Sequence, residues 1–432
     1  MIKIALLGCG TVASGVYKLL NDNRRDIEKR LGDKIEIKKI LELDFDKPRK
    51  LGVKEEQLCS DYNEILNDKE IEIVVELIGG TKIAYEFITK AMEHKKHIVT
   101  ANKDLIALYW KELNELAAKN NVDFYYEASV GGGIPIILPF KGTLAGNRFN
   151  EIIGILNGTT NYILTKMANE NASYEDALAD AQELGYAEAN PSADVEGLDA
   201  ARKISILSTI AFNSQVKLSE VYCEGITEID KTDILVAKEL GYVIKLVGVA
   251  KQDEGKIEAY VRPAFVPKRH PIASVNDVFN AVFLNADAVG DVMLFGRGAG
   301  SLPTASSVVG DIMEICRNLQ DGVHGRYNNI CYENKEVKDV FMTSNKFYVR
   351  MLVSDKTNVL AGISSEFGEH GISLASLKQN TLSEDRAELV IITHKTKESE
   401  LRAALDALMK KDYIHKINTM ICLDSSGIEG EF

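Results

Sequence analysis

The first 130 residues alternate between short apolar runs and longer segments with helical spacing. The apolar runs, which are typical of buried strands, lie at residues 2–7, 35–43, 71–77, 97–100 and 122–127. Apolar residues between the runs recur every three to four positions, and the first such segment extends to about residue 30. Strands that alternate with helices predict an α/β fold, in which a parallel sheet carries helices on its faces.

The pattern becomes mixed after about residue 130, where strands no longer alternate regularly with helices. We expect strands at residues 152–156, 243–251, 256–262 and 291–295, and helices at residues 173–184, 197–212 and from about 304. This predicts a second, α+β domain over residues 131–320. It follows a first domain over residues 1–130, which also takes in a return segment at about 300–330.

A third unit follows a polar segment at residues 333–345, which makes a sensible linker. Strands are expected at residues 347–353, 372–377, 387–393 and 414–423, and helices at 359–369 and 398–409. This βαββαβ order predicts a separate ferredoxin-like domain over residues 346–424. Its helices should cover one face of its sheet and leave the other face, or an edge strand, free to pair with a second copy.

Composition and charge narrow the class of protein. The chain of 432 residues is long enough for two or three domains, and its formal net charge of -13 argues against nucleic-acid or anionic-membrane partners. No apolar run approaches the roughly 20 residues of a membrane span, and no signal peptide is expected. The six cysteines lie far apart without zinc-binding spacing, which favours a reducing, cytoplasmic setting.

A glycine-rich turn follows the first predicted strand. Gly8 permits a tight turn, Gly10 lets the backbone approach a pyrophosphate, and Ala13 is small enough for the helix to pack on the strand. The helix would begin at Thr11 and Val12 and direct its N-terminus toward the phosphates. Strand, glycine turn and helix together predict a Rossmann-type domain that binds a dinucleotide such as NAD or NADP.

Charged residues after the second predicted strand leave the choice of dinucleotide open. Glu42 and Asp44 can accept hydrogen bonds from ribose hydroxyls, which favours NAD. Lys47, Arg49 and Lys50 follow closely and are suited to a 2′-phosphate, which favours NADP.

The densest cluster of candidate functional side chains lies in the segment 185–203. A proline interrupts helix formation there, so Glu188 and Asp194 should lie on an ordered loop, while Asp199 and Lys203 share one face of the following helix. An ordinary solvated Asp–Lys pair is the simplest interpretation of the helix alone, but it leaves the acidic loop unexplained. The carboxylates instead favour a pocket for a small cation, with the lysine as a proton-transfer group.

Two further features lie at the ends of predicted strands. Lys103 follows the fourth strand, at the edge where ligands bind in open parallel sheets, although a surface lysine is the more common case. Glu127 precedes three consecutive glycines at residues 131–133. Such a run allows a tight turn that directs carbonyl groups inward to hold a hard monovalent cation; a plain hinge is an equally good interpretation.

Taken together, these motifs resemble those of the homoserine dehydrogenase family over residues 1 to about 320. The resemblance rests on the glycine turn, the run Ala101-Asn102-Lys103, and the segments 126–135, 154–162, 185–203 and 296–300. It implies the reversible NAD(P)-dependent interconversion of L-homoserine and L-aspartate 4-semialdehyde, in threonine, methionine and isoleucine biosynthesis. It also implies a homodimer or homotetramer whose second domain binds the substrate and dimerises. The C-terminal unit resembles an ACT domain, which implies an amino-acid effector, with L-threonine as the natural candidate.

The resemblance also implies residue roles. Lys203 would be the acid/base residue, and Lys103 would be a second lysine at the reacting oxygen. The implied substrate-binding residues are Glu188, Asp194, Asp199, Gly158 and Thr159. The implied cofactor-binding residues are Gly8, Gly10, Thr11, Val12, Asp44, Gly79, Lys103, Gly185 and Gly300. A sodium ion would be held by Glu127 and by the carbonyl groups of Val130, Gly132 and Ile134.

Two positions depart from the family pattern. Leu43 stands where many members carry an arginine suited to a 2′-phosphate, which inclines the prediction toward NAD or dual use. Residues 355–358 read Asp-Lys-Thr-Asn, where ACT domains usually have Asp-x-Pro-Gly. Effector binding and a purely structural, dimerising role are therefore both open for this unit.

Two other functions fit the coarse pattern. An aspartate-semialdehyde dehydrogenase would need a nucleophilic cysteine near a base, and beyond Cys9 no cysteine lies at a suitable strand end or helix start. A nucleotide-binding sensor with an ACT ligand domain would leave Lys103, Lys203 and the acidic loop without a role.

Overall fold

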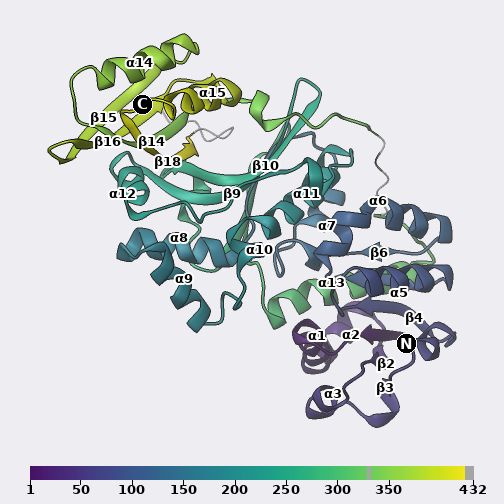
Figure 1. The fold of residues 1–432 in the computed structure, drawn as a ribbon. Coiled ribbons are helices and arrows are strands. Elements are labelled where there is room, and N and C mark those ends of the chain that lie inside the picture. The colour runs from purple at the N-terminus through teal and green to yellow at the C-terminus, as the bar shows by residue number, and fades with distance from the viewer. Residues whose placement is uncertain (328–330, 332, 424–432) are drawn as a thin grey trace.

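The computed structural model describes residues 1–327, 331 and 333–423, and the first of its two large sheets is parallel (Figure 1). Its six strands follow the order β3-β2-β1-β4-β5-β6. They are β1 (Ile2–Leu7), β2 (Ile35–Leu41), β3 (Leu58–Cys59), β4 (Ile71–Glu76), β5 (His97–Thr100) and β6 (Phe124–Tyr125). This is the predicted Rossmann-type sheet. The strand order reverses between β1 and β4, the point where such sheets bind ligands at the carboxyl ends of the strands.

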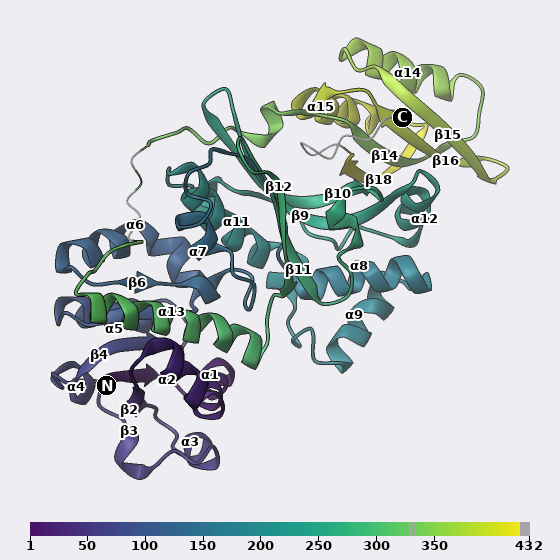
Figure 2. The same ribbon diagram turned by 180° about the vertical axis from the view of Figure 1, so that it is seen from behind.

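Helices cover both faces of this sheet. Those on one face are α1 (Thr11–Asp22), α2 (Arg24–Leu31) and α13 (Ser301–Asp321), and those on the other are α5 (Lys82–Glu93) and α6 (Lys103–Asn120). Because side chains alternate along a strand, Ile4 and Leu6 of β1 pack with the first group, while Ala5 and Leu7 pack with the second. Figure 2 shows that α13, from far along the chain, returns to this sheet, where it packs on α1.

The long helix predicted after β1 is in fact two helices. Asn23 separates α1 from α2 with φ −99° and ψ 13°, although its N–H still donates to the carbonyl of Leu19 (3.1 Å). The three residues at this break, positions 21–23, are Asn, Asp and Asn, which are weak helix formers. The periodicity of the apolar residues continues across the break because both helices cover the same face of the sheet.

The second sheet begins with antiparallel strands in the order β12-β11-β7-β9-β10. They are β7 (Phe149–Ile155), β9 (Tyr242–Asp253), β10 (Lys256–Pro267), β11 (Phe279–Ala286) and β12 (Gly290–Arg297). The helices near them are α8 (Gly158–Glu170), α9 (Tyr174–Glu183), α11 (Leu198–Phe212) and α12 (Lys231–Glu239). The sequence pattern did not predict β11 or α12, and it made β9 and β10 too short.

The C-terminal strands extend the same sheet in the order β18-β14-β16-β15. This unit comprises β14 (Phe347–Ser354), α14 (Val359–Glu369), β15 (Leu374–Ser383), β16 (Arg386–Thr393), α15 (Glu398–Leu408) and β18 (Ile414–Cys422). The order confirms the predicted ferredoxin-like βαββαβ fold. β18 pairs with β10 through Ala264 and Cys422, so the two antiparallel parts form one continuous sheet. β15 is the strand at the end of this sheet, and α12 of the second domain packs on β9.

The segment predicted as a polar linker is attached to the second sheet. The N–H of Lys338 donates to the carbonyl of Ile257 (2.7 Å), and the N–H of Ile257 donates to the carbonyl of Glu336 (2.9 Å). Its polar side chains are consistent with this position because they form ion pairs at the sheet edge, such as Lys338 with Asp253 (3.0 Å). The segment therefore connects the two units while its backbone is hydrogen-bonded to the sheet.

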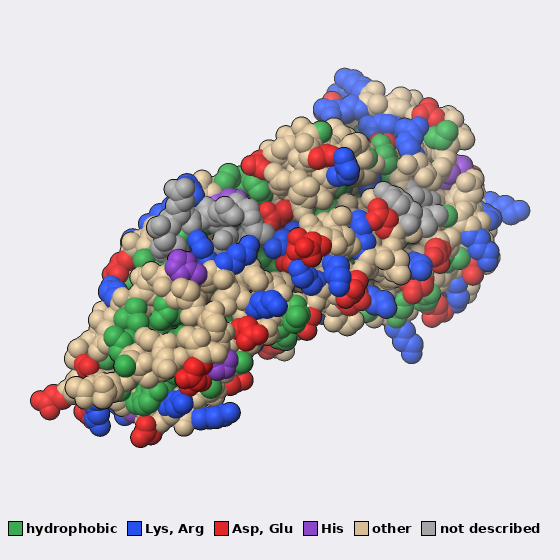
Figure 3. Space-filling view, turned by 90° about the horizontal axis from the view of Figure 1, so that it is seen from above, with side chains coloured by type: hydrophobic (Ala, Val, Ile, Leu, Met, Phe, Trp, Pro, Cys, Tyr) green, Lys and Arg blue, Asp and Glu red, His purple; other side chains and the backbone are tan. Residues whose placement is uncertain are grey.

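The described chain also contains short α-helices and strands. They are α3 (Asp46–Lys50), α4 (Asn63–Leu66), α7 (Ile137–Lys141), α10 (Ser192–Val195), β8 (Tyr222–Cys223), β13 (Ser344–Asn345) and β17 (Thr396–Lys397). None of the described helices is long and apolar enough to cross a membrane. On the face shown in Figure 3, Lys and Arg side chains are interspersed with Asp and Glu side chains.

Candidate active site

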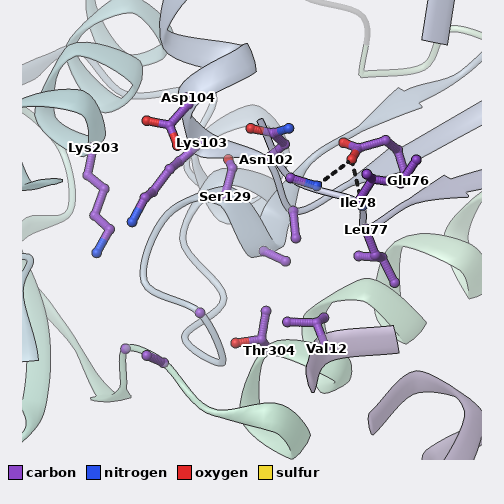
Figure 4. Close-up of a pocket in the computed structure, with 16 residues that line it drawn as sticks. Val12, Glu76, Leu77, Ile78, Asn102, Lys103, Asp104, Ser129, Lys203 and Thr304 are labelled. Carbon is purple, nitrogen blue, oxygen red and sulfur yellow. Dashed lines mark hydrogen bonds between the residues drawn. The ribbon is translucent and has the colours of Figure 1, made fainter. Parts of the chain in front are cut away.

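A cavity of about 320 Å³ lies at the carboxyl ends of the parallel strands, next to the switch between β1 and β4 (Figure 4). Its lining residues are Val12, Glu76, Leu77, Ile78, Gly79, Ala101, Asn102, Lys103, Asp104, Ala128, Ser129, Gly132, Lys203, Gly298, Ala299 and Thr304. Figure 4 shows the side chains of Lys103 and Lys203 together at one end, away from Val12 and Thr304. The cavity therefore joins the glycine turn to the two predicted catalytic lysines.

The glycine turn holds the backbone close to this cavity. Gly8 has φ +94°, and a Cβ there would lie 3.1 Å from the carbonyl oxygen of Leu77, the residue that follows β4. Gly10 is the N-cap residue of α1. Because glycine has no side chain, it does not cap the first N–H groups of this helix. Such N–H groups at a helix N-terminus are suited to a phosphate.

A second cavity of about 340 Å³ flanks the other side of the glycine turn and shares Leu77 and Ile78 with the first. Gly8, Gly10, Glu42, Leu43 and Lys47 are among its lining residues. Two cavities on either side of a glycine turn match the two halves of a dinucleotide joined by its pyrophosphate.

Glu42, not Asp44, is the acidic residue that faces this second cavity. Its carboxylate accepts hydrogen bonds from the N–H groups of Cys9 (2.8 Å) and Leu43 (2.9 Å). Asp44 is exposed and accepts from the N–H of Asp46 (2.9 Å), a local turn contact. Both acidic residues were noted in the sequence, but the strand ends at residue 41, and only the structure shows which of them turns inward.

The basic residues after β2 have unequal access to the same cavity. Arg49 forms an ion pair with Glu55 through two hydrogen bonds (2.6 and 3.1 Å). Lys47, in contrast, lines the cavity. The side chain of Leu43 is 90% exposed at the cavity edge.

Lys103 and Lys203 are bridged by a single buried carboxylate, that of Asp199. Lys203 lies in α11 and is 7% exposed, and its Nζ donates to Asp199 Oδ2 (2.7 Å) and to the carbonyl of Leu156 (2.6 Å). Lys103 is the first residue of α6, and its Nζ donates to Asp199 Oδ1. The structure thus brings together three predicted site residues from two helices.

The environment moves the pKa values of the two lysines in opposite directions. Burial lowers the pKa of Lys203, and the positive charge of Lys103 adds to this effect, while Asp199 opposes it. Burial also disfavours the charge of Lys103, but Asp199 outweighs burial, so the pKa of Lys103 is raised. Burial alone would raise the pKa of Asp199, yet the two ammonium groups hold it below its usual range. Lys203 is therefore the lysine that loses its proton more easily.

Asn157 is a site residue that sequence reasoning missed. Its Nδ2 donates to Asp194 Oδ1 (2.7 Å) and to Asp199 Oδ2 (2.9 Å). It lies in the segment 154–162 that carries part of the family resemblance, and its Oδ1 caps α8 by accepting from the N–H of Thr160 (2.9 Å). The sequence signal was therefore present, but it did not show where the other end of the amide points.

The remaining predicted substrate residues lie at the edge of this arrangement. Glu188 is exposed in the loop before α10, and the hydroxyl of Thr159 donates to the carbonyl of Tyr186 (2.7 Å) in the same loop. A Cβ on Gly158 would lie only 2.8 Å from the carbonyl oxygen of Val278, so a larger residue does not fit there. Of the predicted cofactor-binding residues, Gly185 begins the same loop with φ +74°, and Gly300 is the N-cap of α13. Neither cavity is lined by these residues.

The predicted sodium residues form a tight turn beside the first cavity. The carboxylate of Glu127 accepts from the N–H groups of the first turn of α7, at residues 136–138 (2.5, 2.8 and 2.6 Å). Burial raises the pKa of Glu127, and these N–H groups oppose the rise. Gly131 and Gly132 have φ +72° and +53°, and the carbonyl of Gly132 accepts from the hydroxyl of Ser307 (2.7 Å).

Comparisons with known proteins agree with this geometry. Residues 8–127 match the family model "Homoserine dehydrogenase, NAD binding domain", residues 135–313 match "Homoserine dehydrogenase", and residues 347–412 match "ACT domain". The chain is 39% identical over 431 residues to a homoserine dehydrogenase of Bacillus subtilis, with 99% of each chain covered. A crystal structure of a homoserine dehydrogenase from Thiobacillus denitrificans superposes with a TM-score of 0.93 at 36% identity, covering 99% of both chains. A hyperthermophilic archaeal homoserine dehydrogenase solved with NADPH matches 73% of this chain and 97% of its own, at 28% identity and a TM-score of 0.62.

Proposed function

The chain belongs to the homoserine dehydrogenase family, and from this premise we propose how its residues divide the work of that reaction. The enzyme interconverts L-homoserine and L-aspartate 4-semialdehyde with NAD(P) as the redox partner. The observation that carries the residue assignment is the pair of lysines that share the Asp199 carboxylate at one end of the cavity. Incubation with L-homoserine and NAD or NADP, followed at the absorbance band of the reduced nicotinamide, tests the activity.

Lys203 is the general base for homoserine oxidation. The glycine turn would hold NAD(P), which would supply the hydride acceptor for the carbon that bears the hydroxyl. That step requires the hydroxyl proton to leave, and a lysine accepts it only when neutral. Burial and the neighbouring Lys103 charge lower the pKa of Lys203, which increases its neutral fraction. In the reverse direction the same group returns the proton.

Lys103 remains an ammonium group and stabilises negative charge on the reacting oxygen. Its raised pKa keeps the charge near neutral pH, and its side chain lines the cavity. Two groups of one chemical type whose pKa values are pushed apart can serve as a base and a fixed charge in one site.

The amino group of homoserine binds to the acidic loop through Glu188 and Asp194, with Gly158 and Thr159 shaping the pocket. Asp199 was expected in the same role, but its oxygens are occupied by two lysines and Asn157. We therefore propose that Asp199 orients the lysines and leaves the ammonium group of the substrate to the other two carboxylates.

NAD is the favoured cofactor, with NADP as an alternative. Glu42 places a carboxylate beside the second cavity, where it favours ribose hydroxyls over a 2′-phosphate. Leu43 supplies no charge, and Arg49 is paired with Glu55. Parallel measurements of kcat/KM with NAD and NADP decide between them, and a ratio in favour of NADP would leave Lys47 as the group that binds the extra phosphate.

We propose a sodium site at Glu127, Val130, Gly132 and Ile134. The two left-handed glycines give the tight turn that a ring of carbonyl groups requires. The Glu127 carboxylate already caps α7 and Gly132 accepts from Ser307, so backbone carbonyls are the main ligands left for the ion. A titration of sodium against choline chloride, with melting temperature as the readout, tests the site.

The C-terminal unit is proposed as a regulatory domain over residues 346–424, with an amino-acid effector such as L-threonine. The first domain spans residues 1–130 with the return segment at 300–330, and the substrate and dimerisation domain spans residues 131–320 in a homodimer or homotetramer. Support for regulation comes from buried ion pairs that join the unit to the second domain, such as Arg262 with Glu398 (2.8 Å). None of the six cysteines, all of which lie in the described part of the chain, forms a disulfide, which supports a cytoplasmic setting. Activity measured against millimolar L-threonine, and light scattering for the assembly, test these points.

A further inference from the structure

We propose that Asn157 is a positioning residue for the reaction, which holds Asp194 and Asp199 in the fixed arrangement that the substrate and Lys203 require. The inference rests on the proposed role of Lys203 and extends it to a residue outside the predicted site.

The amide of Asn157 has only one orientation that satisfies its neighbours. It is 5% exposed, and its Oδ1 accepts from the N–H (2.9 Å) and the hydroxyl (3.0 Å) of Thr160. The opposite edge, Nδ2, then has two hydrogens, and two carboxylates accept them: Asp194 (2.7 Å) and Asp199 (2.9 Å). A flipped amide would place its oxygen against both carboxylates and its NH2 against a backbone N–H, so it is excluded.

A neutral double donor suits this place. Two carboxylates that approach the same nitrogen atom repel each other, so a donor between them must hold both in place. Hydrogen bonds from a neutral amide bridge the two carboxylates without adding a positive charge that would compete with the ammonium group of the substrate. A lysine or arginine here would neutralise the carboxylate that is proposed to bind the substrate.

The dipeptide 156–157 contacts both Lys203 and the Asp199 carboxylate that Lys203 binds. The carbonyl of Leu156 accepts from Lys203 Nζ (2.6 Å), while the side chain of the next residue, Asn157, donates to Asp199. Asn157 also begins α8, so this helix N-terminus links α11, which carries Lys203, with α10, which carries Asp194. A displacement of the dipeptide would move the base and the substrate carboxylate together.

Two substitutions separate this role from helix capping. Asn157→Ser keeps a capping oxygen for α8 but removes the double donor. Asn157→Asp keeps the cap, removes the donor in its ionised form, and adds a negative charge near Lys203. Asn171→Asp, at the exposed C-terminal end of the same helix, is the matched control for the added charge.

We expect Asn157→Ser to lower kcat/KM for homoserine by about 10²-fold, because misplacement of a catalytic array by about 1 Å costs that much. The nucleotide dissociation constant and the melting temperature should stay close to those of the parent. Asn157→Asp should also shift the acidic limb of the kcat/KM profile to higher pH, since a new carboxylate raises the pKa of the base. The Asn171→Asp control should leave both unchanged.

The inference is overturned if Asn157→Ser keeps kcat/KM within twofold of the parent. It is also overturned if nucleotide affinity falls as much as kcat/KM does, which would indicate a general structural role. A parent enzyme that fails to oxidise homoserine would instead contradict the proposed function, so the two failures are distinguishable.

Discussion

Replacement of Arg350 by methionine should strongly destabilise the C-terminal unit. Arg350 is 4% exposed, and its guanidinium forms a two-point ion pair with Asp233 of α12 (2.8 and 3.0 Å). It also pairs with Glu388 (3.1 Å) and with Asp230. Methionine has similar reach but no charge, so the substitution leaves the fully buried Asp233 carboxylate without its cation.

The expected loss follows from this burial. Removal of one partner from a buried ion pair typically costs about 3–5 kcal/mol. Asp233 retains hydrogen bonds from the hydroxyls of Tyr348 (2.9 Å) and Thr419 (3.1 Å), which place the cost near the lower end, about 3 kcal/mol. Adding Asp233→Asn removes the stranded charge and should recover at least about 1 kcal/mol, the coupling expected of contacting residues.

Urea unfolding with two probes measures the effect. The chain has one tryptophan, Trp110, in α6 of the first sheet, so its fluorescence reports that unit, while far-ultraviolet circular dichroism reports the whole chain. The dichroism transition of Arg350→Met should move to lower urea and separate from the fluorescence transition. Arg386→Met removes an exposed arginine from the neighbouring strand and should change stability by less than about 0.5 kcal/mol. A loss below about 1 kcal/mol for Arg350→Met, or no recovery in the double variant, would refute the reasoning.

Three further predictions concern the cofactor, the substrate and the domain junction. Leu43→Arg should raise the NADP-to-NAD ratio of kcat/KM by about tenfold, the effect of one charge-assisted hydrogen bond, and an unchanged ratio would contradict the assignment of this cavity edge. Glu188→Gln should raise KM for homoserine more than KM for the nucleotide, whereas Glu183→Gln should change neither; equal effects on both constants would make Glu188 a scaffold residue. Truncation after Ser344 should lower the melting temperature and promote aggregation, because it strips the buried Arg262 and Asp233 of their partners, and a soluble fragment with full activity would disprove this.

Much of the fold was predictable from the sequence because buried parallel strands are apolar runs with clear helices between them. The strand–glycine turn–helix unit at Gly8 and the βαββαβ order of the C-terminal unit are examples. The break at Asn23 was not predictable from periodicity, since both helices present their apolar residues to one face of the sheet. β11 (Phe279–Ala286) was missed although its sequence is apolar, because its strand character depends on pairing with β7 and β12.

The candidate site was predictable in its residue types but not in its partners. Spacing along a helix placed Asp199 beside Lys203, and both lie together in the structure. Lys103 reaches the same carboxylate only because α6 packs against α11. A local sequence pattern cannot show this contact between two distant helices. Composition also could not show that the polar segment 333–345 is hydrogen-bonded through its backbone to the sheet.

The assignment of Lys203 as the base is tested most directly by Lys203→Arg, measured as kcat and kcat/KM for homoserine across pH. Arginine keeps the positive charge beside Asp199 but stays protonated, so it cannot accept the proton. We expect kcat to fall by roughly 10²–10⁴-fold with little change in nucleotide affinity. The parent enzyme should show an acidic limb with an apparent pKa below the ordinary lysine value of about 10.4, and the variant should lose that limb. A Lys203→Arg enzyme with more than half of the parent's kcat and the same pH profile would contradict the account.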